Sequence, residues 1–149
     1  MISLCILLLS CDLAVYGHQV VLITGDQNDG TRTAEIFDPD SGASCSLPNL
    51  MDERAFHTQD GPLTCGGESR PDPGNDDHIT KYKTCFMWKS GAWTLSHSLV
   101  HARTGHVSFT TSQGTFLMGG EGFRNDKTSE LLKPDGSVEP GFELKHRTQ

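Results

Sequence analysis

A short apolar run that ends in a pair of glycines constrains this chain more than any other sequence feature. The clearest copy, GTFLMGGE, carries the doublet Gly119-Gly120, and GPLTCGGE carries Gly66-Gly67 at the same place. A weaker copy, VVLITGD, keeps only Gly25. Such runs predict β-strands that are buried on both faces and end in turns with positive φ or close backbone approach. Recurrence of the run at spacings of tens of residues indicates a repeat.

The segments that follow the glycines repeat as well. TAEIFDPD at residues 33–40 and TSELLKPD at residues 128–135 share Thr, Glu, Pro and Asp at matching places. TCFMWKSG at residues 84–91 occupies the same place in the middle unit with weaker identity. The units therefore agree at several ordered positions, which favours a true repeat over a chance doublet.

A further repeated pattern is Arg-x-x-His, present as Arg54 and His57 and again as Arg103 and His106. An Arg and a His at this spacing are candidates for acid–base catalysis. A catalytic group is needed once, however, whereas a packing contact is needed in every repeat. The recurrence therefore predicts a structural role for all four residues. We interpret the Arg-x-x-His pattern as part of a third segment at the end of each of the first two units.

These landmarks resemble the kelch repeat, which combines an apolar strand, a glycine doublet, an aromatic residue in the next strand and a tryptophan that opens the last strand. The second unit fits best, with Phe86 or Trp88 followed by Trp93. The first unit lacks the tryptophan. The third unit lacks the aromatic residue in its middle segment and offers Phe142 in place of the tryptophan.

The resemblance implies an all-β fold, a partial kelch-type β-propeller of about three blades, each an antiparallel β-meander. The kelch-like region covers residues 18–149, with blades near 20–50, 56–95 and 105–144. Closed propellers have about four to eight blades, and repeat arrays bury their faces only against neighbouring repeats. We therefore expect a piece of a larger propeller, with three explanations left open: a partial sequence, a degenerate relic, or a protomer completed by self-association.

Residues 1–17 resemble a secretory signal peptide, because the apolar run Ile2 to Leu9 is too short to span a bilayer and small residues follow it. No Lys or Arg precedes the run, which departs from the usual pattern. Two alternatives are a lipoprotein signal with Cys11 as the lipidated residue and a core strand of a chain truncated at its start. The expected location is extracellular.

Removal of the leader leaves Cys45, Cys65 and Cys85 of the five cysteines. An odd number leaves one of them outside any intramolecular bridge. In a kelch-like blade the doublet strand and the aromatic strand are antiparallel neighbours, so the resemblance implies a Cys65–Cys85 disulfide. Cys45 then remains as a thiol or links two chains.

No segment predicts a metal or cofactor site. The acidic loops at residues 26–30 and 72–77 lack the ligand spacing of an EF-hand. His97, His101 and His106 form a local cluster, but this segment has no helical period that would place the imidazoles on one face. Acidic side chains exceed basic ones by 19 to 12, which disfavours nucleic acid and anionic membranes as partners.

The sequence thus predicts a secreted, non-enzymatic binding module whose surface loops recognise a protein or a glycan. One alternative is a fragment or divergent relative of a copper radical oxidase, which also uses kelch-like blades. That resemblance implies a Cys-linked Tyr, a second Tyr and His ligands, and Tyr82 is the one tyrosine outside the leader. A truncated relic without activity of its own is the other alternative.

Overall fold

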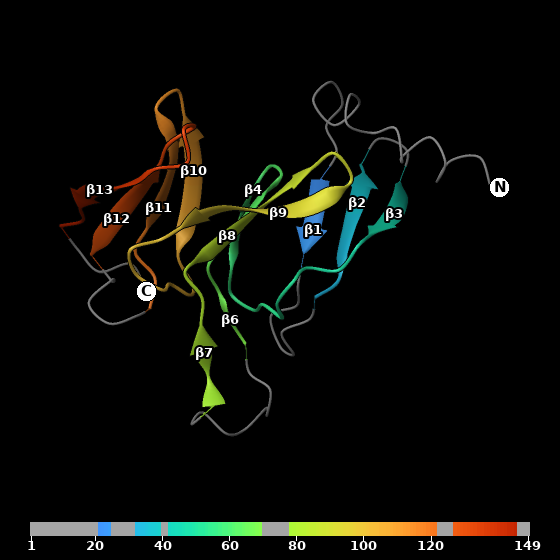
Figure 1. Ribbon diagram of the computed structural model, residues 1–149, viewed down its shortest axis with the longest axis horizontal. Coiled ribbons are helices and arrows are strands. Elements are labelled where there is room, and N and C mark those ends of the chain that lie inside the picture. The colour runs from blue at the N-terminus through green and yellow to red at the C-terminus, as the bar shows by residue number, and fades with distance from the viewer. Residues whose placement is uncertain (1–20, 25–31, 40–41, 70–77, 122–126, 146–149) are drawn as a thin grey trace.

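The computed structural model describes residues 21–24, 32–39, 42–69, 78–121 and 127–145. In these residues the regular structure is β-strand, arranged in three main antiparallel sheets and one two-stranded ribbon (Figure 1). The predicted signal peptide at residues 1–17, Gly25 and both acidic loop candidates lie outside the described residues.

The three main sheets follow one another along the chain. The first sheet contains β1 (Val21–Thr24), β2 (Ala34–Asp38) and β3 (Ala43–Leu47). The second contains β4 (Thr58–Asp60), β5 (Leu63–Cys65), β8 (Thr84–Lys89) and β9 (Ala92–Ser98). The third contains β10 (Val107–Thr111), β11 (Gly114–Met118), β12 (Thr128–Leu132) and β13 (Val138–Glu143). The ribbon pairs β6 (Glu68–Ser69) with β7 (Thr80–Lys81) and extends the connection between β5 and β8.

Within each sheet the spatial order of the strands equals their order in the sequence, and every pairing is antiparallel. Each sheet is therefore a meander, as the repeats predicted. Tight turns make this arrangement possible. Between β8 and β9, Ser90 and Gly91 have φ angles of 53° and 78°, the two positive values that a type I′ hairpin turn requires.

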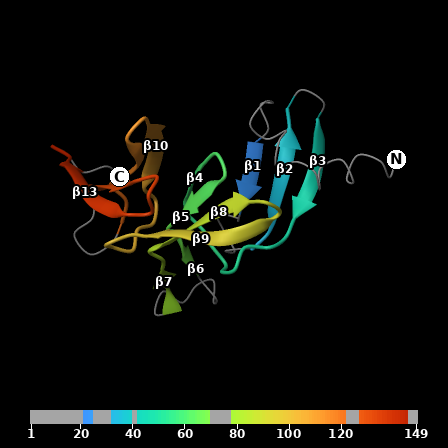
Figure 2. The same cartoon turned by 45° about the horizontal axis from the view of Figure 1, so that its top comes forward.

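The second sheet lies between the first and the third, as both views show (Figure 2). Separate apolar cores fill the two interfaces. The core between the first and second sheets consists of Ala34, Leu50, Phe86 and Trp93, with Leu47 and Trp88 packed against it. The core between the second and third sheets consists of Leu63, Cys65, Cys85, Leu99, Leu117 and Leu132, with Met87 and Val138 packed against it.

Two details of the sequence interpretation are corrected by the structure. The Arg-x-x-His segments do not close a unit: Arg54 and Arg103 bind carbonyl oxygens of the sheet that follows each of them. Phe142 does not replace Trp93 either. Trp93 pairs with Trp88 near the start of β9, and the residue in the matching place of the third sheet is Val138, which pairs with Leu132.

Candidate functional site

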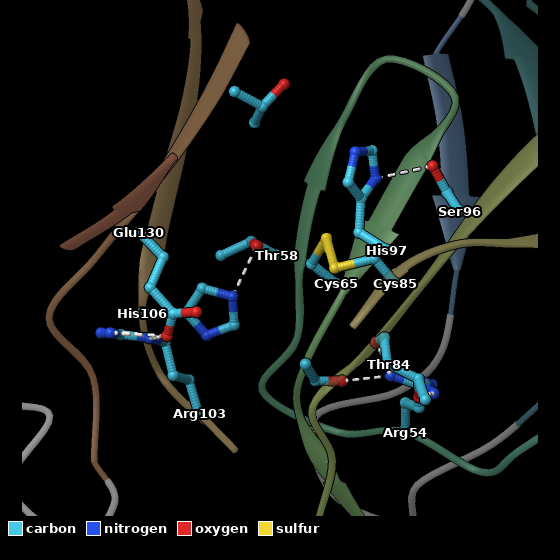
Figure 3. Close-up of a disulfide and its surroundings, with 12 residues drawn as sticks. Arg54, Thr58, Cys65, Thr84, Cys85, Ser96, His97, Arg103, His106 and Glu130 are labelled. Atoms are coloured by element: carbon cyan, nitrogen blue, oxygen red, sulfur yellow. Dashed lines mark hydrogen bonds and ion pairs between the residues drawn. A yellow bond between two sulfur atoms is a disulfide. The ribbon is translucent and has the colours of Figure 1, made fainter. Parts of the chain in front are cut away.

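The most elaborate polar arrangement in the described part of the chain surrounds the buried guanidinium group of Arg103. Its side chain is 0% exposed. Nη1 donates to the carbonyl oxygens of Gly119 at 2.8 Å and Thr128 at 3.0 Å, and Nη2 donates to Oγ1 of Thr128 at 2.8 Å. Nε donates to Glu130 Oε1 at 2.9 Å. Arg103 thereby joins the end of β11 to the start of β12. Figure 3 shows Arg103 beside Glu130.

Arg54 makes the same contacts one sheet earlier. Nη1 donates to the carbonyl oxygens of Gly66 at 2.6 Å and Thr84 at 2.9 Å, and Nη2 donates to Oγ1 of Thr84. Gly66 and Thr84 hold the same places in the second sheet as Gly119 and Thr128 hold in the third. The repeat therefore extends to individual hydrogen bonds. One planar, permanently charged donor thus serves the carbonyl oxygen of the glycine and adds a second hydrogen bond to the threonine carbonyl oxygen, which already accepts the N–H of that glycine.

The fourth partner of the guanidinium differs between the two sheets. Glu130 stands two residues after the threonine in the third sheet, and Phe86 stands two residues after the threonine in the second. The Phe86 ring centroid lies 4.9 Å from Cζ of Arg54. Glu130 is 2% exposed and also accepts a hydrogen bond from the backbone N–H of Val100 at 2.6 Å. One position thus supplies a cation–π contact in one sheet and a buried ion pair in the next.

Two further groups complete the environment of Arg54. Its Nη2 lies 3.1 Å from the carboxylate of Asp52, which is 38% exposed, and its Cζ lies 4.6 Å from the ring centroid of Tyr82. Burial lowers the pKa of Arg54, and the hydrogen bond and charge of Asp52 oppose that change. An arginine guanidinium is in general protonated far above neutral pH, and the Asp52 carboxylate favours that charged form here.

His106 connects the second and third sheets. Its Nε2 and Oγ1 of Thr58 are 2.8 Å apart and share a hydrogen bond. Burial, with smaller contributions from the charges of Arg103 and His57, lowers the pKa of His106 to about 3. The imidazole is therefore neutral at neutral pH. Gly66 makes room for it, since a Cβ there would lie 2.6 Å from both His106 Cε1 and the carbonyl oxygen of Arg103.

The predicted disulfide between Cys65 and Cys85 is present (Figure 3). The two residues are directly opposite each other in β5 and β8, with Cα atoms 4.1 Å apart. Gly66 donates its backbone N–H to Thr84, so the cysteines occupy the adjacent pair, which is not hydrogen-bonded and has the closer side chains. Cys45 lies on β3 and contacts the carbonyl oxygen of Ser46 through its sulfur at 3.9 Å.

Trp93 connects the first and second sheets. It is 9% exposed, and its indole N–H donates to the carbonyl oxygen of Pro48 at 2.8 Å. Its ring also packs on Trp88, with ring centroids 5.2 Å apart. The tryptophan singled out in the sequence is therefore an interface residue between neighbouring sheets.

The side chains of His106 and Trp93 and the backbone of Arg103 bind neighbouring sheets together. The Arg54 guanidinium joins strands within the second sheet, and His57 lies beside Gly67 of the same sheet. Sequence reasoning considered Tyr82 only for a copper site and did not foresee its contact with Arg54. It also did not foresee the different roles of Phe86 and Glu130, which each stand two residues after the recurring threonine. Within the described ranges no group of three or more His, Cys, Asp or Glu side chains is placed to hold a metal ion. No helix in those ranges is long and apolar enough to cross a membrane.

Comparisons with known proteins give a fold likeness. No protein-family model matches the sequence, and no curated protein matches it. The chain is similar to the solved structure of YjhT, with a TM-score of 0.68 and 12% sequence identity. The match covers 85% of this chain and 49% of the YjhT chain, so this chain spans about half the length of YjhT.

Proposed function

We propose that this chain is a secreted, non-enzymatic kelch-type propeller module that binds an extracellular protein or glycan. The observation that carries the proposal is the repeated junction. Arg54 and Arg103 make matching sets of hydrogen bonds, so these buried cations serve as structural supports in successive sheets. Buried charges used in this way stabilise a scaffold, and binding then falls to the loops that the scaffold presents.

The propeller geometry is supported by three meander sheets that pack face to face in sequence order, with an apolar core at each interface. The fold likeness to YjhT is consistent with this reading. Extracellular location is supported by the Cys65–Cys85 disulfide, because bridges of this kind persist in oxidising compartments, and by the signal-like residues 1–17.

The β6–β7 ribbon indicates where binding would occur. It continues the second sheet beyond its doublet and carries the connection to residues 70–77. In Figure 1 it projects from the end of the sheets away from the β12–β13 turn. Because β6 and β7 pair on either side of residues 70–77, this interval can vary in sequence without disturbing the core. We assign ligand recognition to this end of the sheets.

The test uses the full chain, purified from the medium of secreting cells and applied to glycan and extracellular-protein arrays. Replacing residues 70–77 by an equally long Gly-Ser segment is expected to abolish binding while the circular dichroism spectrum stays unchanged. The control changes Pro134 and Asp135 to serine in the exposed β12–β13 turn and is expected to bind normally. Oxidase activity with stoichiometric copper would instead favour the enzyme alternative. Equal binding by both variants would show that residues 70–77 do not form the binding site.

A further inference from the structure

The third sheet has one covered face and one exposed apolar face. Leu117, Leu132 and Val138 point into the core shared with the second sheet. The opposite side, here named the open face of the third sheet, lies at the end of the row of sheets in Figure 1. Most of its members are apolar: Val107 (51% exposed), Phe109 (39%) and Phe142 (46%), together with the partly buried Phe116, Met118 and Leu131. Glu139, which pairs with Leu131 and forms an ion pair with Lys133, adds a charged group to this side.

The open face repeats the surface with which the second sheet binds the third. Counted from the glycine doublets, Phe116 corresponds to Leu63. Counted from the threonines that open the next strand, Leu131 corresponds to Met87. Leu63 and Met87 belong to the core between the second and third sheets. Phe116 and Leu131 therefore hold the positions that a following sheet covers.

A leucine that follows the last strand of each sheet is buried where another sheet follows and partly exposed where none is described. The backbone N–H groups of Leu50, Leu99 and Leu144 donate to Arg32, Lys83 and Lys127 in matching places. Leu50 is 1% exposed and Leu99 is 2% exposed, each covered by the sheet that follows. Leu144 is only partly buried. Its environment is that of the other two with the following sheet removed.

The first sheet presents the side that would face a preceding sheet, and this side is mixed, with Glu35 and its partner Ser46 beside an aromatic residue. Counted from the same threonine, Phe37 on β2 corresponds to Trp88 and Leu132, which pack on the preceding sheet. Ser44 on β3 pairs with Phe37 and so lies on the same side. We name this side the open face of the first sheet. Phe37 is partly exposed and Ser44 is exposed, because no described sheet precedes them.

We infer that a second copy of this chain covers both surfaces, with the open face of each third sheet packed on the open face of the partner's first sheet. Two such contacts close a ring of six sheets, within the range of about four to eight for propellers. The contact continues the packing already seen twice inside the chain, and YjhT carries about as much chain again as the part matched here. The inference rests on the propeller geometry of the proposed function.

Sedimentation velocity on the oxidised full chain tests this assignment. The wild-type chain is expected to be a dimer at roughly 100 μM. Phe142→Glu and Ser44→Glu place a carboxylate in the contact from opposite sides, and each is expected to raise the dimer Kd about 100-fold or more. Leu95→Glu is the control: Leu95 is 62% exposed on β9 and belongs to neither open face. Both test residues are exposed, and circular dichroism checks that each variant folds.

Mixing the two test variants separates head-to-tail packing from a symmetric contact. Each variant retains one intact surface, so the mixture is expected to form a heterodimer that neither variant forms alone. A dimer that survives Ser44→Glu but not Phe142→Glu would mean that two third sheets face each other, which overturns the inference. A wild-type monomer, or an open polymer series, overturns it as well. A monomer that binds its array ligand would contradict the dimer and leave the proposed function intact. A dimer that binds no array ligand would support the dimer and contradict the proposed binding function.

Discussion

Replacing Arg103 by methionine is expected to destabilise the fold by about 3–5 kcal/mol, the usual cost of removing one partner of a buried ion pair. Methionine fills part of the space but donates no hydrogen bond. The carboxylate of Glu130, whose side chain is 3% exposed, would remain buried without its cation. The carbonyl oxygen of Gly119 would also lose its donor, and that of Thr128 would keep only the backbone N–H of Gly119.

The second sheet offers a matched control, because Arg54 binds the same backbone groups without a buried carboxylate. Its acidic neighbour Asp52 is 38% exposed and turns to water when the cation is removed. Arg54→Met is therefore expected to cost about 1–3 kcal/mol, the value of the lost charged hydrogen bonds and unpaired carbonyl groups. The difference between the two variants, about 2 kcal/mol, measures the stranded charge of Glu130.

Urea unfolding at pH 7, followed by tryptophan fluorescence, gives both free energies of unfolding. Glu130→Gln in the Arg103→Met background removes the charge and keeps an acceptor for the Val100 N–H, so about 1–2 kcal/mol should return. Equal losses in Arg54→Met and Arg103→Met, or no recovery on adding Glu130→Gln, would refute the reasoning that the carboxylate sets the cost.

Further changes test the other contacts. Because burial lowers the pKa of His106 to about 3, the unfolded state takes up the proton first as the pH falls below 6.5. Stability should then fall by about 1.4 kcal/mol per pH unit toward pH 3, and His106→Gln should flatten the dependence of the urea midpoint; an unchanged slope contradicts this. Gly66→Ala should cost about 3 kcal/mol or more in urea unfolding, since it adds a clash to positive φ, whereas Gly42→Ala, with φ of +69° and open space, should cost about 1–2 kcal/mol. Similar losses would exclude the clash. Replacing Cys65 and Cys85 by alanine opens a bridge between residues 20 apart and should cost about 3 kcal/mol, and a thermal midpoint that neither this change nor reduction lowers would argue against a stabilising bridge.

The sequence was sufficient to predict an all-β chain of antiparallel meanders because the repeat places glycine doublets, strands and turns in a recurring order. The Cys65–Cys85 pairing followed from strand adjacency that the repeat resemblance implied, and the structure confirms it. Both inferences depend on local pattern and on which strands are neighbours. They do not depend on how one sheet rests on another.

The contacts between sheets were beyond such reasoning. Arg54 and Arg103 are identical in the sequence pattern, but the identity of the residue facing each guanidinium is visible only once the strands are paired. Phe142 appeared to replace a tryptophan by its type, whereas register gives that place to Val138. Placing a residue in a repeat unit therefore requires the strand register as well as the residue type.

The position of the disulfide gives the chain an unusual response to proteolysis. Every residue from 66 to 84, including the β6–β7 ribbon, lies within the loop that Cys65 and Cys85 close. A single cut in that interval would leave two polypeptides joined by a covalent bond that is at most 1% exposed. The nicked protein would migrate as one species on a non-reducing gel and as two after reduction. The chain could therefore be opened between residues 66 and 84 to create a new N-terminus and C-terminus, because the disulfide in the second sheet would still join the piece with the first sheet to the piece with the third.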